Sequence, residues 1–233
     1  MKKFHLESVV LALGIVLLGL FIQRGLKSFS ERDRYVSVKG LAEKEVEADR
    51  VIWPIVYKTV GNDLQSLYSD ISRANNLIVG FLKKNGIPES DVSIGAPQIV
   101  DMLADRYNSN KVSNRYNVTS VITVSSSQVS KARGLMSRMG ELLKEGIAIS
   151  ANDYDSRVQY DFTSLNKIKP QMIEEATRNA REAGNKFAKD SESKLGKIKS
   201  ASQGLFSISD RDANTPFIKN VRVVTTIDYY LDN

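Results

Sequence analysis

Residues 35–61, YVSVKGLAEKEVEADRVIWPIVYKTVG, decide the fold class that the sequence predicts. In the first half of this stretch, small or apolar side chains alternate with charged or polar ones. The small and apolar face holds Val36, Val38, Gly40, Ala42, Val46 and Ala48, with Lys44 as the exception to the alternation. A period of two with one polar side predicts a half-buried antiparallel strand. We expect EADR to turn the chain and VIWPIVYKTVG to return as the second strand of a hairpin.

The return strand carries Pro54, which has no backbone N–H to donate to a strand ladder. We therefore predict that this strand lies at the edge of its sheet or carries a bulge. Strand addition between subunits would cover such an edge. In the last predicted strand, one of Tyr229 and Tyr230 must point outward, and tyrosine is enriched in subunit contacts. The candidates for an oligomer interface are therefore Trp53, Pro54 and Tyr230.

Three amphipathic stretches separate the predicted strands. Apolar residues recur at helical spacing in residues 62–86, 127–146 and 164–196. The order of elements is β-β-α-β-β-α-β-β-α-β-β, with the strands in hairpin pairs. This order favours an α+β fold with mostly antiparallel sheets and three packing helices over a doubly wound parallel sheet. A helix–Gly–strand–loop–strand pattern follows both the first and the third helix, and it suggests two related halves within residues 31–233.

The predicted helices carry recognisable end signals. Asn62 or Asp63 is placed to cap the first helix, and Gly86 is placed to end it in a left-handed conformation. Gly146 ends the second helix, and we expect Gly196 to end the third. Pro170 falls where the first turn of the third helix should lie. Along that helix we expect a stripe narrow enough for close packing on a sheet, formed by Ala176, Ala180, Ala183 and Phe187.

Residues 1–30, MKKFHLESVVLALGIVLLGLFIQRGLKSFS, form a hydrophobic leader with a basic start. Its apolar run from Val9 to Ile22 matches a signal-peptide core and is short of the roughly 20 residues of a full membrane span. No small-x-small cleavage site follows, and extension of the helix through Leu6 and Leu26 gives the length of an anchor. We favour an uncleaved signal-anchor that holds residues 31–233 in the periplasm at the inner membrane. A cleaved signal and a soluble periplasmic domain are the alternative.

Two residue types that carry much of enzyme chemistry are missing from the predicted domain. The chain has no cysteine, and its single histidine is His5 in the leader. Thiolate sites, histidine triads and histidine metal ligands are therefore excluded from residues 31–233. The net charge of the chain is +6. Residues 1–30 carry four basic residues and one acidic residue, so residues 31–233 carry only +3. A charge this low disfavours a nucleic-acid partner. No glycine-rich phosphate motif occurs either, so we expect no cofactor.

Acidic residues are the remaining candidates for a chemical site. Asp210, Asp212 and Asn214 have the spacing that begins a calcium loop. The sixth and twelfth positions of that loop would be Thr215 and Val221, where glycine and glutamate are needed, so a solvated turn is favoured. Further pairs that could do acid–base work, although solvated loops fit them better, are Asp153 with Asp155 and Asp101 with Asp105.

The ordered segments of the chain resemble a known family. VSVKGLAEKEVEADRVIWPI, LKKNGIPESDVSI, RYNVTSVITVS, EEATRNAREAGNKFAKDSESKLGKI and VRVVTTIDYYL follow one another in this order. The set resembles the SIMPL domain family of bacterial exported proteins, which includes periplasmic immunogenic proteins of some pathogens, over residues 35–231. The chain departs from the family at Ala42, where a second glycine is expected, and at residues 48–50, where Pro-Asp is commoner.

The resemblance implies an α+β domain, an envelope location, a tendency to form large homo-oligomers and a loose link to envelope or oxidative stress. It implies no catalytic residues. We therefore expect a non-catalytic envelope protein that is anchored to the membrane by its leader and assembles with itself. The first rival is a carboxylate-dependent hydrolase, with or without a metal, that acts in the envelope. The second is a binding module for another envelope protein or a small ligand.

Overall fold

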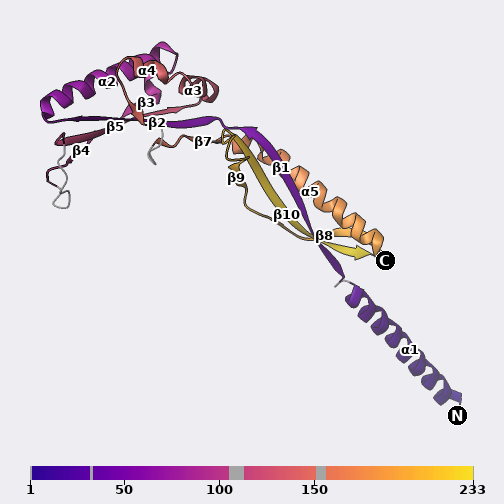
Figure 1. The fold of residues 1–233 in the computed structure, drawn as a ribbon. Helices are drawn as coiled ribbons and strands as arrows, with labels where there is room; N and C mark the ends of the chain where they lie inside the picture. The colour runs from indigo at the N-terminus through magenta and orange to yellow at the C-terminus, as the bar shows by residue number, and fades with distance from the viewer. Residues whose placement is uncertain (1, 32–33, 105–112, 151–155, 233) are drawn as a thin grey trace. The chain divides into compact units, whose positions relative to one another are not determined.

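The computed structural model describes residues 2–31, 34–104, 113–150 and 156–232 (Figure 1). It confirms an α+β fold with mostly antiparallel sheets. The chain forms two compact units. Unit 1 comprises residues 1–44, 166–207 and 221–233, and unit 2 comprises residues 45–165 and 208–220.

The leader forms helix α1 (Lys2–Glu31), so the predicted N-terminal hydrophobic helix is confirmed. Its described side chains from Val9 to Gln23 are all exposed. Within the part of the chain that the structure describes, no helix is both long and apolar enough to span a membrane.

Unit 1 is built on a four-stranded sheet covered by one long helix. The sheet order is β1-β10-β8, and β9 also pairs with β10. The elements are β1 (Tyr35–Glu47), α5 (Leu165–Asp190), β8 (Lys194–Gln203) and β10 (Ile218–Asp232), whereas of β9 (Ser207–Asp210) only Ser207 belongs to unit 1. The predicted inward faces are confirmed: alternate residues of β1 and β10 are buried, with Tyr229 4% exposed and Tyr230 half-buried.

Helix α5 lies unusually close to β1. A Cβ atom on Gly40 would overlap the carbonyl oxygen of Ala176 and lie 2.8 Å from the Cβ atom of Ala180. The buried stripe consists of Met172, Ala176, Ala180, Gly184 and Ala188. Ala176 and Ala180 of the predicted stripe are therefore confirmed, but Ala183 is only half-buried and Phe187 is 59% exposed. The stripe repeats every four residues and so drifts around the helix, which leaves Phe187 on its flank.

Two predicted landmarks of α5 are wrong. The helix begins at Leu165, so Pro170 is its sixth residue and lies beyond the first turn. The helix ends at Asp190, before a turn in which Glu192 has φ 55°. Gly196 therefore does not end it and lies inside β8, where a Cβ atom would come within 3.0 Å of the carbonyl oxygen of Tyr230. The glycine allows the two strands to approach closely.

Unit 2 is a six-stranded sheet with the order β3-β5-β2-β6, in which β4 also pairs with β5 and β7 with β2. Figure 1 shows α2, α3 and α4 on one face of this sheet. The elements are β2 (Arg50–Gly61), α2 (Leu64–Lys84), η1 (Glu89–Asp91), β3 (Val92–Ile94), β4 (Gln98–Asp101), β5 (Tyr116–Ser126), α3 (Val129–Met136), α4 (Gly140–Lys144), β6 (Ile149–Ser150) and β7 (Gln159–Asp161). The core between sheet and helices includes Trp53, Ile55, Ile78, Leu82 and Ile122.

Helix α2 has the predicted ends. The Asp63 carboxylate caps it by accepting a hydrogen bond from the backbone N–H of Ser66 at 2.7 Å. Gly86 follows the helix with φ 84°. The predicted second helix is instead two short helices, because the backbone N–H groups of Arg138 and Met139 bond to carbonyl oxygens three residues back instead of four. There the Ser137 hydroxyl donates to the carbonyl oxygen of Gly134 at 2.8 Å, a local bond that competes with the helical ladder.

The predicted hairpin over residues 35–61 is wrong. Strands β1 and β2 belong to different sheets, with β1 next to β10 and β2 next to β5. The connection between β1 and β2 is fixed by hydrogen bonds to residues of unit 2 that are distant in the sequence, which a hairpin turn would not make. The Asp49 carboxylate accepts hydrogen bonds from the backbone N–H groups of Thr163 at 2.7 Å and Ser164 at 2.9 Å. Burial raises the pKa of Asp49, but the hydrogen bonds from Thr163 and Ser164 outweigh it and lower the pKa overall.

Candidate functional site

The side of β2 that faces away from β5 has a gap in its pairing. Strand β5 pairs with β2 continuously from Val51 to Gly61. On the other side, β7 pairs with residues 50–52 and β6 with residues 56–57. In these registers, residues 53–55 have no partner on that side among the described strands. Pro54 lies in the middle of the gap, where the absence of an N–H group costs no ladder bond.

The predicted edge position of this strand is therefore wrong, because β2 has neighbours on both sides. Its side chains agree with a central strand: Val51, Ile55 and Val56 are at most 1% exposed. Trp53 is 5% exposed and belongs to the core. Of the two candidates on this strand, only Pro54, which is half-buried, remains partly accessible.

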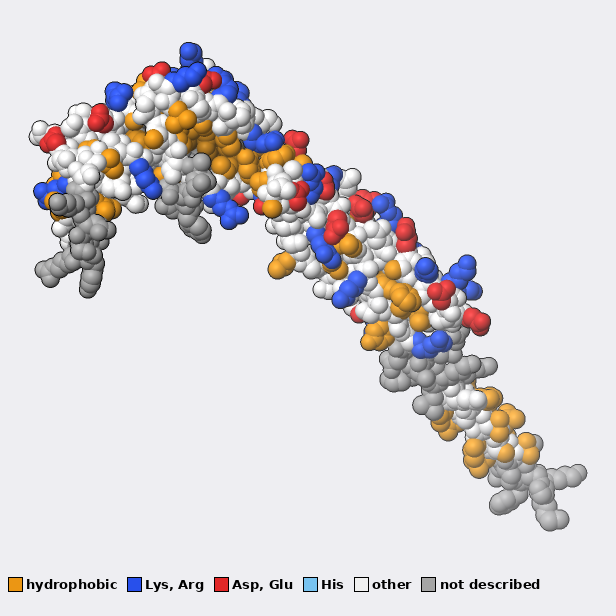
Figure 2. Space-filling view, viewed as in Figure 1, with side chains coloured by type: hydrophobic (Ala, Val, Ile, Leu, Met, Phe, Trp, Pro, Cys, Tyr) orange, Lys and Arg blue, Asp and Glu red, His pale blue; other side chains and the backbone are white. Residues whose placement is uncertain are grey.

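An apolar depression of about 360 Å³ lies beside this gap. We call it the β2 depression; its lining residues are Trp53, Pro54, Met136, Met139, Gly140, Leu143, Ile149, Ser150, Ser156 and Val158. Figure 2 shows hydrophobic side chains gathered on unit 2 between α3 and β7. Leu143 stands out because it is 61% exposed, whereas the neighbouring Leu142 is 2% exposed. Met139 and Gly140, at the junction of α3 and α4, are among the lining residues.

A second, larger depression of about 830 Å³ shares Pro54 and Val158 with the first. It is polar, and its ionisable lining groups are Arg157, Tyr160, Asp161, Asp210 and Lys219. The carboxylate of Asp161 accepts a bond from the Arg50 guanidinium at 3.0 Å, and Asp210 pairs with Lys219. The Lys219 side chain is only 10% exposed, so Asp210 provides the counter-charge that its burial requires.

A stacked group of side chains supports both depressions from below. The guanidinium carbon of Arg133 lies 3.3 Å from the centroid of the Phe217 ring, and the Tyr160 ring meets Phe217 edge-on at 6.2 Å between centroids. The Tyr160 hydroxyl donates to the sulfur of Met136 at 3.7 Å. Burial raises the pKa of Tyr160. These contacts hold Met136 and Tyr160 in fixed positions at the two depressions.

The residues of the proposed calcium loop form a tight turn. The Asp212 carboxylate accepts hydrogen bonds from the backbone N–H groups of Asn214 at 2.8 Å and Thr215 at 2.9 Å, and from the Thr215 hydroxyl. The bonds from Thr215 and Asn214 lower the pKa of Asp212 to about 2. Asp210 is engaged by Lys219. A solvated turn is the favoured interpretation, and calcium binding by Asp210, Asp212 and Asn214 stays the weaker, untested hypothesis, in which the ion would compete with these bonds.

The other acidic candidates do not come together in the described structure. The Asp101 carboxylate is held by Arg115 at 2.8 Å, and that hydrogen bond lowers the pKa of Asp101. Asp105, Asp153 and Asp155 lie outside the described residues. Among the described residues, no group of three or more histidine, cysteine, aspartate or glutamate side chains is placed to hold a metal ion.

Tyr230 lies in unit 1, on the side of the sheet away from α5, and its ring centroid is 5.7 Å from the Lys199 ammonium. Sequence reasoning missed Leu143 as a surface residue, because the residues Val129, Ala132, Met136, Met139 and Leu143 fit the buried stripe of one continuous helix. The signal that could have found it is the cluster Gly134, Ser137 and Gly140, which weakens a helix at that point.

The comparisons with known proteins bear on the whole domain. The profile of the SIMPL family, described as a protein of unknown function (DUF541), matches residues 36–225. No curated protein matches the chain.

Proposed function

Because the chain belongs to the SIMPL family, we propose that it is a non-catalytic envelope protein whose folded domain assembles with itself through the β2 depression. The observation that carries the proposal is the exposed apolar surface around Leu143 and Pro54. Leu143 is 61% exposed in a depression lined by two methionines, Trp53 and Ile149. Burial of such a side chain in a subunit contact contributes about 1.5–3 kcal/mol. Exposed apolar patches with polar rims mark interaction surfaces more often than chemical sites.

The chemistry of the described residues supports a non-catalytic role. The acidic side chains near the depressions, Asp161, Asp210 and Asp212, each accept bonds from internal partners. Carboxylates held in this way serve to fix loops and strands. The rival hydrolase would need carboxylates that are free to transfer protons or bind a metal.

The envelope location is part of the same proposal. It is supported by the basic, apolar leader. Helix α1 would hold the domain at the membrane, with a cleaved leader as the alternative. The link to envelope or oxidative stress rests on the family resemblance alone.

The test of self-assembly is the molar mass of the full chain in detergent, measured by light scattering after gel filtration over a range of protein concentrations. The detergent contribution is subtracted by combining the refractive-index and absorbance signals. A stable multiple of 26.0 kDa supports the proposal. A mass of 26.0 kDa at every concentration would overturn self-assembly and turn attention to a binding role for the two depressions.

A further inference from the structure

Strand β8 of unit 1 is an edge strand, and α5 covers only its start, where Leu195 packs against Gly184. It closes the sheet order β1-β10-β8, and all its residues except Leu195 and Gly196 are exposed. A helix is about 10 Å wide with its side chains, and strands lie about 4.8 Å apart, so one helix covers two strands well. Helix α5 lies closest to β1, as Gly40 shows, and so Ile198 on β8 is 52% exposed.

The exposed end of this strand combines basic, aromatic and apolar side chains. Residues 186–200 carry five lysines against Asp190 and Glu192, and Asp228 and Asp232 of β10 lie opposite Ser200 and Lys194, which leaves a net charge of +1. No described carboxylate forms an ion pair with Lys194 or Lys197. The Lys199 ammonium lies 3.9 Å from the ring centroid of Tyr35, which is 50% exposed. We call this surface the basic edge; it consists of Tyr35, Lys194, Lys197, Ile198, Lys199 and Tyr230.

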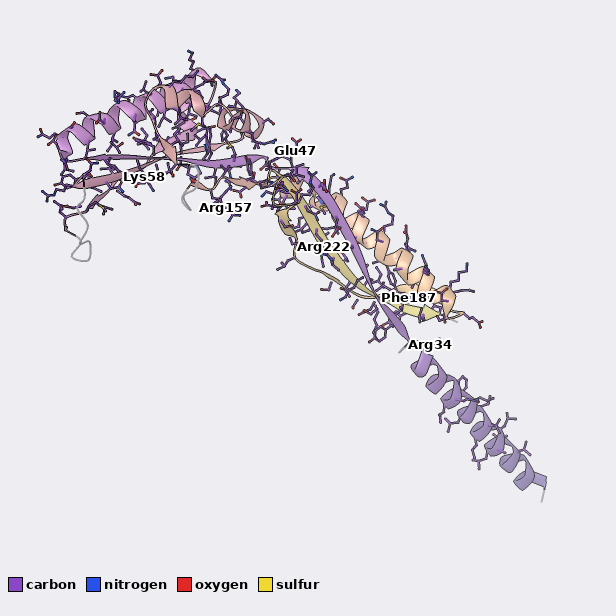
Figure 3. All side chains as sticks on the ribbon, in the orientation of Figure 1. Arg34, Glu47, Lys58, Arg157, Phe187 and Arg222 are labelled. Atoms are coloured by element: carbon purple, nitrogen blue, oxygen red, sulfur yellow. The ribbon has the colours of Figure 1, made fainter. Side chains whose placement is uncertain are left out.

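The basic edge lies at the end of unit 1 that follows the leader in the chain. Tyr35 comes four residues after Glu31, the last residue of α1, so their Cα atoms are at most about 14 Å apart. Leu231 at the end of β10 donates its N–H to the carbonyl oxygen of Arg34 at 3.0 Å, which ties β10 to the same end. Figure 3 shows Arg34 and Phe187 at this end of unit 1.

We propose that the basic edge docks on a membrane surface that contains anionic lipid. This inference rests on the proposed membrane location of α1. The Lys199 ammonium lies beside the rings of Tyr35 and Tyr230, and lysines on such a surface can reach phosphate groups while tyrosine rings occupy the boundary between headgroups and acyl chains. A second copy of the chain is disfavoured as the occupant, because lysines along an exposed strand oppose strand addition. The proposal assigns Tyr230 to lipid and leaves the β2 depression for subunit contacts.

The experiment uses the full chain reconstituted with vesicles. Because the chain has no cysteine, Ser202→Cys on the exposed part of β8 gives a single site for an environment-sensitive fluorophore. Vesicles of phosphatidylcholine are compared with vesicles of phosphatidylcholine and phosphatidylglycerol, both with a quencher attached to the lipid headgroup. The test variant is Lys197→Glu with Lys199→Glu, and the matched control is Lys84→Glu with Lys144→Glu in unit 2, which changes the net charge equally.

We expect quenching in anionic vesicles that is weak in neutral ones and that decreases as the ionic strength rises from about 0.05 M to about 0.5 M. Reversal of Lys197 and Lys199 should lower the ratio of docked to undocked protein about twentyfold or more, whereas the control variant should keep it. Equal quenching in both kinds of vesicle would overturn recognition of anionic lipid. Absence of quenching in protein that floats with the vesicles would overturn docking. Fluorophore shielding that depends only on protein concentration would overturn it as well, and would assign the basic edge to a subunit contact.

Failure of the anchor has a different signature, because the chain would then not float with neutral vesicles. In that case, binding to anionic vesicles that the Lys197 and Lys199 reversal abolishes still supports the basic edge. Binding to neither kind of vesicle overturns both the anchor and the docking surface.

Discussion

A Cβ atom on Gly40 of β1 would lie 2.8 Å from the Cβ atom of Ala180 on α5. This relationship fixes how close the helix comes to the sheet in unit 1. Gly40→Ala should therefore force the helix and strand apart and destabilise the protein by about 3 kcal/mol, at the upper end of overpacking effects. The free energy of unfolding, from urea denaturation, measures the loss.

The control for this substitution is Gly134→Ala in α3, where an added Cβ atom meets no heavy atom within 4 Å. That variant should be about 0.5–1 kcal/mol more stable than the natural chain, because alanine favours a helix over glycine. If Gly40→Ala left the unfolding free energy unchanged, the close packing of α5 on β1 would be contradicted.

Tyr57→Phe should destabilise unit 2 by about 1–2 kcal/mol, because it removes a buried hydrogen-bond donor. The Tyr57 hydroxyl donates to the side-chain oxygen of Asn75 at 2.8 Å beneath α2. Tyr68→Phe is the matched control, since Tyr68 lies on α2, the helix that carries Asn75, and is 72% exposed. Urea denaturation of both variants makes the comparison. An equal effect of the two changes would argue against the Tyr57–Asn75 bond.

Asp212 should titrate far below an ordinary aspartate. Hydrogen bonds from Thr215 and Asn214 lower its pKa in the folded protein to about 2, from 3.8. Since the folded pKa is the lower one, the charged carboxylate stabilises the fold fully above pH 3.8, and this contribution is lost as the pH falls toward 2. Carbon NMR of the Asp212 carboxyl group measures the pKa directly. A midpoint near 3.8 would show that the turn is open in solution.

Asp49→Ala should destabilise the connection between β1 and β2 by about 2 kcal/mol, because it leaves the N–H donors of Thr163 and Ser164 without their carboxylate. The effect should be larger than the loss of about 1 kcal/mol expected for Asp63→Ala, which removes only the cap of α2. Hydrogen exchange of the Thr163 and Ser164 amides gives the local readout. Unchanged exchange at both amides would refute the role of Asp49.

Local patterns predicted the faces of the strands better than their partners. The alternation in β1 and β10 follows from one buried face each, and a period of two is visible in any window of the sequence. The partner of β2 is set by contacts with residues far along the chain, such as Trp53 opposite Val124. Apolar residues on both faces of β2 were the signal for a central strand. The sequence analysis gave Pro54 more weight, because a gap between β6 and β7 has no local signature.

The candidate surface was harder to predict than the fold. Leu143 fits the predicted stripe, but the buried residues of α3 and α4 are Ala132, Leu135 and Leu142, and a break follows Met136. Gly134 and Ser137 weaken the helix there, but both residues occur inside intact helices as well. The calcium hypothesis rested on spacing alone, whereas Asp212 serves as an acceptor for the two residues that follow it in the turn.

The central claim is that the domain assembles through the β2 depression, and its most direct test is the mass of Leu143→Glu beside that of Leu205→Glu. Both leucines are exposed, at 61% and 95%, so neither change should unfold the protein, and Leu205 belongs to unit 1, whereas all the lining residues of the depression belong to unit 2. A buried charge in place of a leucine should raise the dissociation constant at least about tenfold. We predict that light scattering shows Leu143→Glu dissociating toward 26.0 kDa while Leu205→Glu keeps the multimer of the natural chain. An undiminished multimer of Leu143→Glu at every concentration would contradict the claim.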